Sequence, residues 1–381
     1  MLSYTDSRVL KTIYGHHNPA TEGFSEMTKN RFEYQGSANG TQNILSALGN
    51  EEHGRFRKLF SHAFSERGMR EMQPRIQGFV DLLIQGLKEA ASEEHVDIHK
   101  WYNWCAFDMI GDLAFGDSFH CLETQSTSPW IAAIFGNIKT LAFRMVILLY
   151  GLDWLLPYLT PKRLSDLRTA NLKFTREKMA KRIEMGEGQG NFFDKAIAES
   201  DLEKGTDMSR GEMDSNASIL VLAGSETTAT LLSGATFLLC KHPDVLRKLN
   251  EEVRSTFARE EDIDLMSVSK LDYLLVVLDE ALRMYPPVPN TGARTVPKQG
   301  SMVAGKWVPG GVSIPRPANT LQERLKLIQQ SFRCRLESSR TPPAFWTSTS
   351  IVLMNSVLSV GSRTHPSSLQ MTIVQLGYLS H

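Results

Sequence analysis

The feature that most limits how this chain can fold is an apolar segment at about residues 216–241, which an acid and two threonines interrupt. Its centre reads AGSETTATLL from Ala223 to Leu232, and most of its other residues are Ile, Leu, Val, Ala and Phe. A polar start at residues 214–216 and a stop at His242-Pro243 predict one helix from about Asn216 to Lys241. The composition of this helix predicts that it is buried.

Two residues of that helix are costly in a buried setting and need an explanation. Gly224 costs about 1 kcal/mol relative to alanine in a helix, and a buried carboxylate at Glu226 needs a partner or water. One interpretation is that the glycine, the acid and the Thr227 hydroxyl hold a small ligand and relay protons to it. The other is a polar network that only fixes packing. These ten residues alone do not decide between the two.

Composition limits the remaining possibilities. The 381 residues are 41% hydrophobic and 22% charged, which is typical of one large globular domain or two smaller ones. The 42 basic and 42 acidic residues cancel, so no global field favours nucleic acid or an anionic membrane. The cysteines at positions 105, 121, 240 and 334 form no CxxC pair, which argues against a zinc ribbon or a disulfide scaffold.

The most apolar stretch, residues 140–159, is interrupted by Arg144, Gly151, Asp153 and Pro157. We therefore expect a buried or membrane-grazing helix pair there, and no bilayer span. The start of the chain turns polar at once and shows no signal peptide.

Periodicity predicts a mainly α protein with a small β part. From about residue 51 to 260, apolar residues recur at three- and four-residue spacing, as in Met72, Ile76, Phe79, Val80 and Leu83. A charged, glycine-containing segment at 185–211 predicts a surface connection around one short helix. After Tyr285, Pro-Pro, Gly-Gly and short β-prone runs predict a small sheet.

The amino-acid composition changes again after Gly311. Residues 312–381 hold two acidic residues, seven Lys or Arg and 18 Ser or Thr, so this segment carries a formal charge of +5. We expect residues 1–311 to form one domain and 312–381 to be a divergent basic tail. Two origins compete: a separate Ser/Thr-rich tail, or residues from a frame shift or retained intron, which we favour because no linker precedes them.

Two further pairs of residues have the spacing of one helical turn. Glu280 and Arg283 precede Tyr-Pro-Pro-Val-Pro and share one face of a helix that the prolines end. His53 and Arg57 stand four apart, and cations at that spacing suit carboxylate or phosphate groups. Taken alone, each pair is more often two ordinary solvent-exposed side chains on a helix surface.

Taken together, the three motifs in this order resemble the cytochrome P450 family of haem-thiolate monooxygenases. AGSETT is similar to the oxygen-binding helix motif of that family, and GluAlaLeuArg with TyrProProValPro is similar to its Glu-x-x-Arg pair and the turn after it. The resemblance covers about residues 1–311. SerHisAlaPheSer at 61–65 and the run from Asp108 to Gly116 resemble the fungal secondary-metabolism branch.

The resemblance implies a role for each motif residue. Glu226 and Thr227 would deliver protons at the dioxygen site, and Gly224 would leave room for dioxygen. A haem cofactor would have its propionates bound by His53, Arg57 and Arg294. Glu280 and Arg283 would be structural.

The resemblance also implies the partners of an intact relative. It would take electrons from an NADPH-cytochrome P450 reductase and hydroxylate an apolar secondary metabolite, a terpenoid or a polyketide. Substrate contacts would come from residues 1–50 and 140–159. No nucleic-acid partner is expected.

The resemblance fails at the axial ligand. The family places its cysteine in Phe-x-x-Gly-x-Arg-x-Cys-x-Gly, and the sequence contains no such run. The nearest match, 358–367, keeps Gly361 and Arg363 but has His365 where the cysteine belongs, and we favour a chance match. Cys334 lacks the Gly-x-Arg approach and is the weaker candidate. Because the thiolate supplies the electron density for O–O cleavage, we expect impaired or absent activity.

Relatives of this branch are anchored in the endoplasmic reticulum membrane. The anchor would precede Met1, so we expect this chain to be cytoplasmic or peripheral. The competing hypothesis for the whole chain is a non-catalytic helical remnant or interaction protein without stable haem.

Overall fold

The computed structural model of the chain describes residues 9–15, 26–31, 33–34, 39–90, 96–128, 130–131, 147, 150–152, 154, 158, 162–199, 208–288 and 291–316. The predictions made for His365 and Cys334, and most of those for 140–159, lie outside these residues. In the part that is described, helices dominate and the strands form two short sheets, all but β1 lying after residue 290, which confirms a mainly α fold with a small β part.

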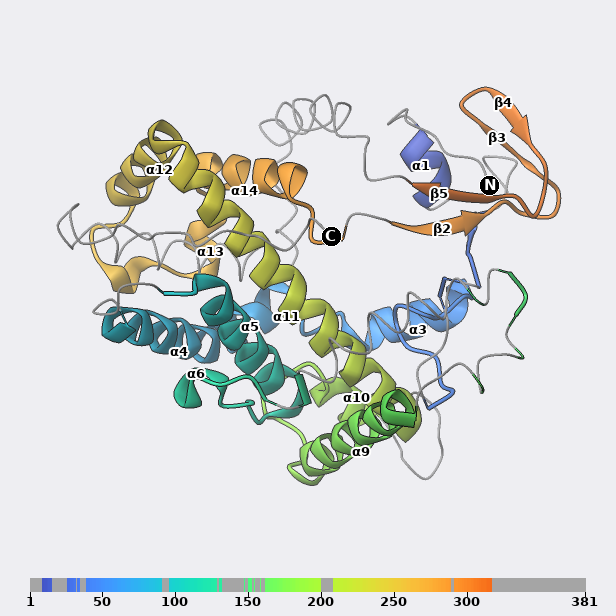
Figure 1. Cartoon of the computed structure of the whole chain (residues 1–381), viewed down its shortest axis with the longest axis horizontal. Helices are drawn as coiled ribbons and strands as arrows, with labels where there is room; N and C mark the ends of the chain where they lie inside the picture. The colour runs from blue at the N-terminus through green and yellow to red at the C-terminus, as the bar shows by residue number, and fades with distance from the viewer. Residues whose placement is uncertain are drawn as a thin grey trace.

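The helices other than α1 lie in one body around α11, and α1 lies beside the strands (Figure 1). Their bounds are α1 Val9–Tyr14, α3 Asn50–Phe60, α4 Glu66–Ala90, α5 Ile98–Phe115, α6 Cys121–Thr124, α9 Lys162–Glu184, α10 Asp194–Glu199, α11 Arg210–Lys241, α12 Pro243–Thr256, α13 Leu265–Val268 and α14 Asp272–Met284, with a 3-10 turn at Glu260–Asp262.

Helix α5 packs along α11 and is buried over almost its whole length. Two side-chain hydrogen bonds fix the register of the pair. The Tyr102 hydroxyl lies 3.0 Å from Thr236 Oγ1, and one turn away His99 Nδ1 lies 3.0 Å from Ser233 Oγ. Since buried polar groups need partners, these bonds specify one alignment of two otherwise apolar surfaces.

The start of α11 differs from the prediction. The helix ends at Lys241 as expected but begins at Arg210, six residues before the predicted start. Ser209 caps it: its side chain accepts the Glu212 amide, and the Glu212 carboxylate accepts the Ser209 amide. This reciprocal capping box satisfies two amides that would otherwise lack partners. The polar residues at 214–216 are therefore buried helix interior and do not form a helix start.

Those polar residues hold the segment before α3 against α11. Asn43 Nδ2 donates to Ser215 Oγ at 3.1 Å, and the Ile44 amide donates to Asn216 Oδ1 at 2.8 Å. Residues 39–47 thus connect to α11 through buried hydrogen bonds.

The strands are β1 Thr28–Lys29, β2 Thr291–Thr295, β3 Ser301–Val303, β4 Lys306–Val308 and β5 Ser313–Arg316. An antiparallel sheet has the order β1-β2-β5, and β3 and β4 form an antiparallel hairpin. With α1, these strands lie at one end of the molecule in Figure 1. They enclose a second small core of Val9, Ile13, Met27, Val296, Val303, Val308 and Ile314, apart from the large helical core.

Strand β5 lies beyond Gly311 and pairs with β2, with Ile314 opposite Arg294. The first residues of the expected tail therefore share the sheet, whereas residues 317–381 lie outside the described part. The domain boundary and the origin of the tail stay predictions. Among the residues described, no helix combines the length and apolar character needed to cross a bilayer.

Candidate haem-side surface

One face in the middle of α11 is open, although about half of the helix is buried. Ala223 is exposed, and Leu222, Glu226, Thr227 and Thr230 are half-buried. These residues recur at three- and four-residue spacing, so they share one side of the helix. Their neighbours Val221, Gly224, Ser225, Thr228 and Ala229 are buried. A small residue on this open face leaves room for a ligand next to the helix.

Glu226 lies on this open face without a partner. Its half-buried carboxyl makes no hydrogen bond or ion pair with any described residue, and burial raises its pKa above the usual value. Burial disfavours the charged form, so the carboxyl retains its proton to higher pH than a solvated glutamate. Next to it, the Thr227 hydroxyl donates to the Ala223 carbonyl at 2.6 Å, which leaves the hydroxyl lone pairs directed away from the backbone.

Helix α3 carries an exposed cation, Arg57. Phe56, Leu59 and Phe60 bury one side of the helix, which leaves Arg57 exposed and His53 half-buried one turn earlier. Arg57 has no hydrogen bond or ion pair with a residue in the described ranges.

Arg55 joins α3 to the first turn of α11. Its Nη2 lies 2.5 Å from Glu212 Oε1, and its Nη1 lies 3.3 Å from Glu212 Oε2. Burial alone would raise the pKa of Glu212, but the bonds to Arg55 and Ser209 outweigh that effect and lower it. The glutamate that caps α11 therefore also orients the helix that carries His53 and Arg57.

Arg294 lies on β2, between β1 and β5. Its guanidinium carbon is 5.4 Å from the ring centre of Tyr14 and 5.8 Å from that of Tyr34. Cation–π contacts of this kind hold a guanidinium without neutralising it. Within the described part of the chain no carboxylate pairs with Arg294, which leaves its charge available to an anion.

Glu280 and Arg283 form the pair expected from their spacing. Arg283 Nε lies 2.6 Å from Glu280 Oε2 and Arg283 Nη2 lies 2.5 Å from Glu280 Oε1. The arginine side chain is 13% exposed and the glutamate side chain 47%. The bond to Glu280 raises the pKa of Arg283. A bidentate pair between two half-buried side chains fixes the end of α14, and the role that the resemblance implies stays a prediction.

Three cysteines fall within the described residues, and none has the surroundings of a metal-bound thiolate. Burial raises the pKa of Cys121 to about 11 and also raises the pKa of Cys105 and Cys240. The Cys105 thiol donates to the Phe79 carbonyl at 3.7 Å. The described ranges contain no group of three His, Cys, Asp or Glu residues that could hold a metal ion.

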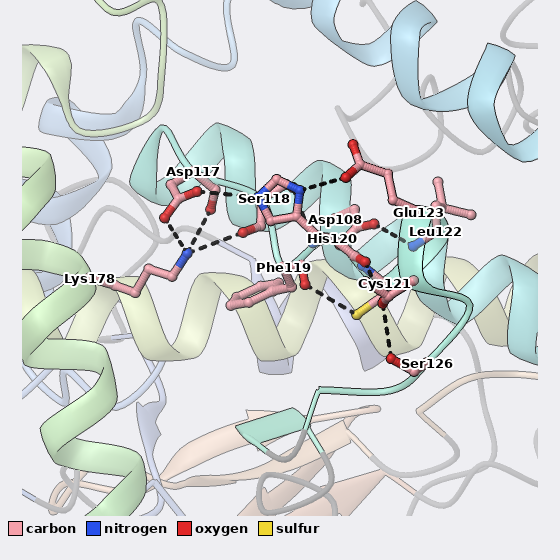
Figure 2. Close-up of polar contacts among 11 residues, drawn as sticks. Asp108, Asp117, Ser118, Phe119, His120, Cys121, Leu122, Glu123, Ser126 and Lys178 are labelled. Carbon is pink, nitrogen blue, oxygen red and sulfur yellow. Dashed lines mark hydrogen bonds and ion pairs between the residues drawn. The ribbon is translucent and has the colours of Figure 1, made fainter.

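The run from Asp108 to Gly116 has a structural role that the sequence did not indicate. Figure 2 shows the Asp108 carboxylate beside α6, where it accepts the amides of Cys121 at 2.9 Å and Leu122 at 2.8 Å. Asp112 binds Arg75 at 2.6 Å, and Gly116 ends α5 at a φ of 71°. Asp108 and Gly116 thus fix the connection from α5 to α6, and Asp112 joins α5 to α4.

Lys178 of α9 binds the segment that connects α5 to α6. In Figure 2 its ammonium lies 2.5 Å from Asp117 Oδ2 and donates to the Ser118 carbonyl at 3.1 Å. Asp108 could have been suspected from its acidic side chain within an apolar run, but its partners lie 13 and 14 residues away and are set by the turn.

Comparison with known proteins agrees with this arrangement. Residues 1–325 match the family described as cytochrome P450. The chain therefore belongs to the cytochrome P450 family. The crystal structure of the cytochrome P450DA heme domain superposes with a TM-score of 0.70 over 94% of this chain and 79% of that one, at 18% identity, which shows the same fold.

Curated relatives come from fungi and confirm the expected branch. Averantin hydroxylase of Dothistroma septosporum is 45% identical over 82% of this chain and 58% of its own length. Versicolorin B desaturase of Aspergillus parasiticus is 41% identical over 81% and 61%. Trichothecene C-15 hydroxylase of Fusarium sporotrichioides is 42% identical over 81% and 62%. The chain spans less than two thirds of the length of these relatives.

The described residues fit one side and the edge of a haem. The open face at Ala223 provides space, Glu226 and Thr227 provide proton-bearing groups beside it, and Arg57 and Arg294 provide uncompensated cations for propionates. The iron side has no fitting ligand among the described residues, since the three cysteines there favour the neutral thiol.

Proposed function

We propose that this chain derives from a monooxygenase that hydroxylates an apolar secondary metabolite, a terpenoid or a polyketide. The observation that carries the proposal is the open face of α11, where Glu226, which has no partner among the described residues, lies near an exposed Ala223. The names of the fungal relatives, two hydroxylases and a desaturase, support an oxidative reaction. Electrons would come from an NADPH-cytochrome P450 reductase.

A bound haem would supply the activation of dioxygen. Burial raises the pKa of Glu226 and so favours its protonated form, from which a proton could pass to a ligand beside Ala223. Thr227 accepts and relays a proton through its hydroxyl, which the Ala223 carbonyl orients. Gly224 lies on the buried side of α11, next to the exposed Ala223, and the Glu280–Arg283 pair holds the end of α14.

At the edge of the cofactor, Arg57, Arg294 and His53 would neutralise the propionates. Each arginine is uncompensated by carboxylates in the part of the chain that is described, so an anion adds attraction without breaking an existing ion pair.

The exposed side chains of Tyr150, Leu152, Trp154 and Tyr158 support contact of segment 140–159 with an apolar substrate or a lipid surface. Large apolar side chains exposed together in one segment are typical of binding surfaces. We propose that this segment lies at the substrate entrance.

We further propose that the 381-residue chain turns over slowly or not at all. The sequence lacks the cysteine of the family's ligand motif, with His365 at the matching offset and Cys334 without the Gly-x-Arg approach. An imidazole ligand gives less electron donation to the iron than a thiolate does.

The second candidate is a helical protein without stable haem that serves as an interaction surface. The observation in its favour is the neutral state of the three described thiols, which leaves the described body without an anionic sulfur ligand. In that case the open face of α11 would be apolar surface without its ligand.

The test is the absorption spectrum of the purified 381-residue chain after haem supplementation, with reduction and exposure to carbon monoxide. We expect an imidazole-type Soret band that is lost in His365→Ala, or a weak band of non-specifically bound haem. A thiolate-type band that is lost in Cys334→Ala, together with substrate turnover, would overturn the proposed impairment. Absence of any band would favour the second candidate.

A further inference from the structure

Lys29 and Arg294 are cross-strand neighbours on one face of the small sheet. In the antiparallel register of β1 and β2, the Cα of Lys29 pairs with the Cα of Arg294. Directly opposed residues in antiparallel strands have side chains on the same face. Both cations also lie over the same ring, with Lys29 Nζ 5.4 Å and Arg294 Cζ 5.8 Å from the centre of Tyr34.

Among the described residues no carboxylate forms an ion pair with Lys29 or Arg294, although the charge of Glu52 acts on Lys29. The Lys29 ammonium donates to the backbone carbonyls of Ile44 at 3.3 Å and Leu45 at 2.8 Å, and it binds no carboxylate. The nearby Glu33 carboxylate is engaged by the Ala293 amide at 2.5 Å. Like charges directly opposed across strands are destabilising, so the sheet keeps an unfavourable arrangement that an anion would relieve.

The pKa of Lys29 also responds to the neighbouring positive charge. Burial, and then the charge of Arg294, lowers its pKa to about 8, while Glu52 of α3 acts in the opposite sense. Burial raises the pKa of Tyr34, so this phenol stays neutral and supplies no negative charge. Tyr14 uses its hydroxyl to bind the Gly292 carbonyl at 3.4 Å.

We propose that Lys29 and Arg294 together bind one carboxylate group, supplied by a propionate of the haem. This inference rests on the proposed function and adds Lys29 to the residues that the sequence indicated. The chemistry of the site is that of a carboxylate or another small oxyanion between an ammonium and a guanidinium.

The site is connected to α11 by two hydrogen bonds through Ile44. Lys29 binds the Ile44 carbonyl, and the Ile44 amide binds Asn216 of α11. An anion that holds Lys29 in its charged form strengthens the first of these contacts. Occupation of the cation pair therefore holds residues 44–45 between the sheet and α11.

The predicted binding is linked to protons. Because the anion stabilises the ammonium, Lys29 takes up a proton on binding whenever the pH lies above about 8. The affinity for the anion should fall as the pH rises through that value. In Lys29→Arg, whose side chain stays charged, the affinity should keep its value at about pH 7 up to about pH 9.5.

The first experiment measures the dissociation constants of haemin and of its dimethyl ester for the 381-residue chain by fluorescence quenching at about pH 7. We expect Lys29→Gln to weaken haemin binding about tenfold and to leave the binding of the ester unchanged. Lys306→Gln, an exposed lysine on β4, is the control and should change neither value. An unchanged affinity of Lys29→Gln for haemin would overturn the propionate assignment.

The second experiment follows acetylation of Lys29 by mass spectrometry at about pH 8, a readout that needs no enzymatic activity. Protection by haemin, but not by its ester or by millimolar acetate and phosphate, would support the propionate as the source. Protection by acetate or phosphate would place a free anion there and overturn the propionate source while keeping the two-cation site. No protection by any of the four would overturn the site itself.

The two experiments also separate this inference from the proposed function. If the unaltered chain binds neither haemin nor its ester, the proposed function fails, and protection by acetate or phosphate still tests the cation pair. If the chain binds haemin as tightly without Lys29, the proposed function survives and the inference fails.

Discussion

Glu226 has a half-buried carboxyl, and no described residue forms a hydrogen bond or an ion pair with it. Its raised pKa means that the folded chain binds a proton more tightly than the unfolded chain does. The free energy of unfolding should therefore decrease as the pH rises from about 4.5 through the raised pKa. Glu226→Gln should remove this decrease and be at least as stable near neutral pH. Urea unfolding between about pH 4 and pH 7.5 measures the difference.

The control for this prediction is Glu89→Gln on the exposed part of α4, which should reproduce the pH profile of the unaltered chain. If Glu226→Gln lowers stability near neutral pH, the carboxylate has a partner, and the proton-holding role assigned to it is wrong.

A second residue-scale prediction concerns Gly111 in α5. A Cβ at this position would lie 2.6 Å from Cε2 of Phe119, and the Phe119 ring cannot retreat because it stacks on Trp130 at 5.0 Å and on Phe174 at 6.3 Å. Overpacking of this kind costs about 1–3 kcal/mol, which exceeds the gain in helix propensity. Gly111→Ala should therefore lower the free energy of unfolding, as measured by circular dichroism in urea.

Gly78 of α4 is the matched control, because a Cβ there meets no atom within 4 Å. Gly78→Ala should stabilise the chain by about 0.5–1 kcal/mol through the backbone entropy of glycine. Equal effects of the two substitutions would contradict the packing argument.

At the scale of elements, the first turn of α11 joins three parts of the fold. Glu212 completes the capping box with Ser209 and binds Arg55 of α3. Ser209→Ala should cost about 1 kcal/mol, the usual effect of losing a cap. It should also increase amide exchange in α3, since loss of the bond from the Glu212 amide to Ser209 Oγ loosens the first turn, which holds Glu212 beside Arg55.

Hydrogen exchange with mass spectrometry measures both effects. Ser255→Ala, near the exposed end of α12, is the control and should leave α3 unchanged. Faster exchange confined to residues 209–213 would show that the capping box and the α3 contact are independent.

The elements were predictable to the extent that their signals are local. The three- and four-residue spacing at Met72, Ile76 and Leu83 predicted α4, and the prolines after Tyr285 predicted the end of α14. The start of α11 was missed because the Asp214–Asn216 run looked like a polar helix start, whereas Ser209 and Glu212 formed the capping box. The burial of 214–216 depends on residues about 172 positions away, which no local pattern contains.

The candidate site, too, was predictable where its contacts are local in the sequence and not where they join distant segments. The spacing of Glu280 and Arg283 gave their pairing, because both lie on one helix. The pairing of Lys29 with Arg294 depends on the register of two strands that are far apart in the sequence, so the sequence indicated Arg294 alone.

At the scale of the whole molecule, two cores of unequal size should unfold separately. Among the described residues, the helical core holds about fifty buried side chains, whereas the core of α1 and the strands holds seven. Since stability grows with buried apolar surface, the sheet and α1 should open at a lower free energy than α5 and α11. Amides of β2–β5 should therefore exchange before those in the middle of α11.

Haemin should reduce the difference in opening free energy between the sheet and the helical core, because the cations proposed to bind it lie on elements of both. Arg57 belongs to the helical core and Arg294 to the sheet, so one ligand that contacts both links the opening of the sheet to its own release. At a hundredfold excess over the dissociation constant, the linkage adds about 2.7 kcal/mol, or roughly a hundredfold slower exchange in β2–β5. The dimethyl ester should give little of this protection. Equal protection by haemin and its ester would mean that the propionates do not join the two cores.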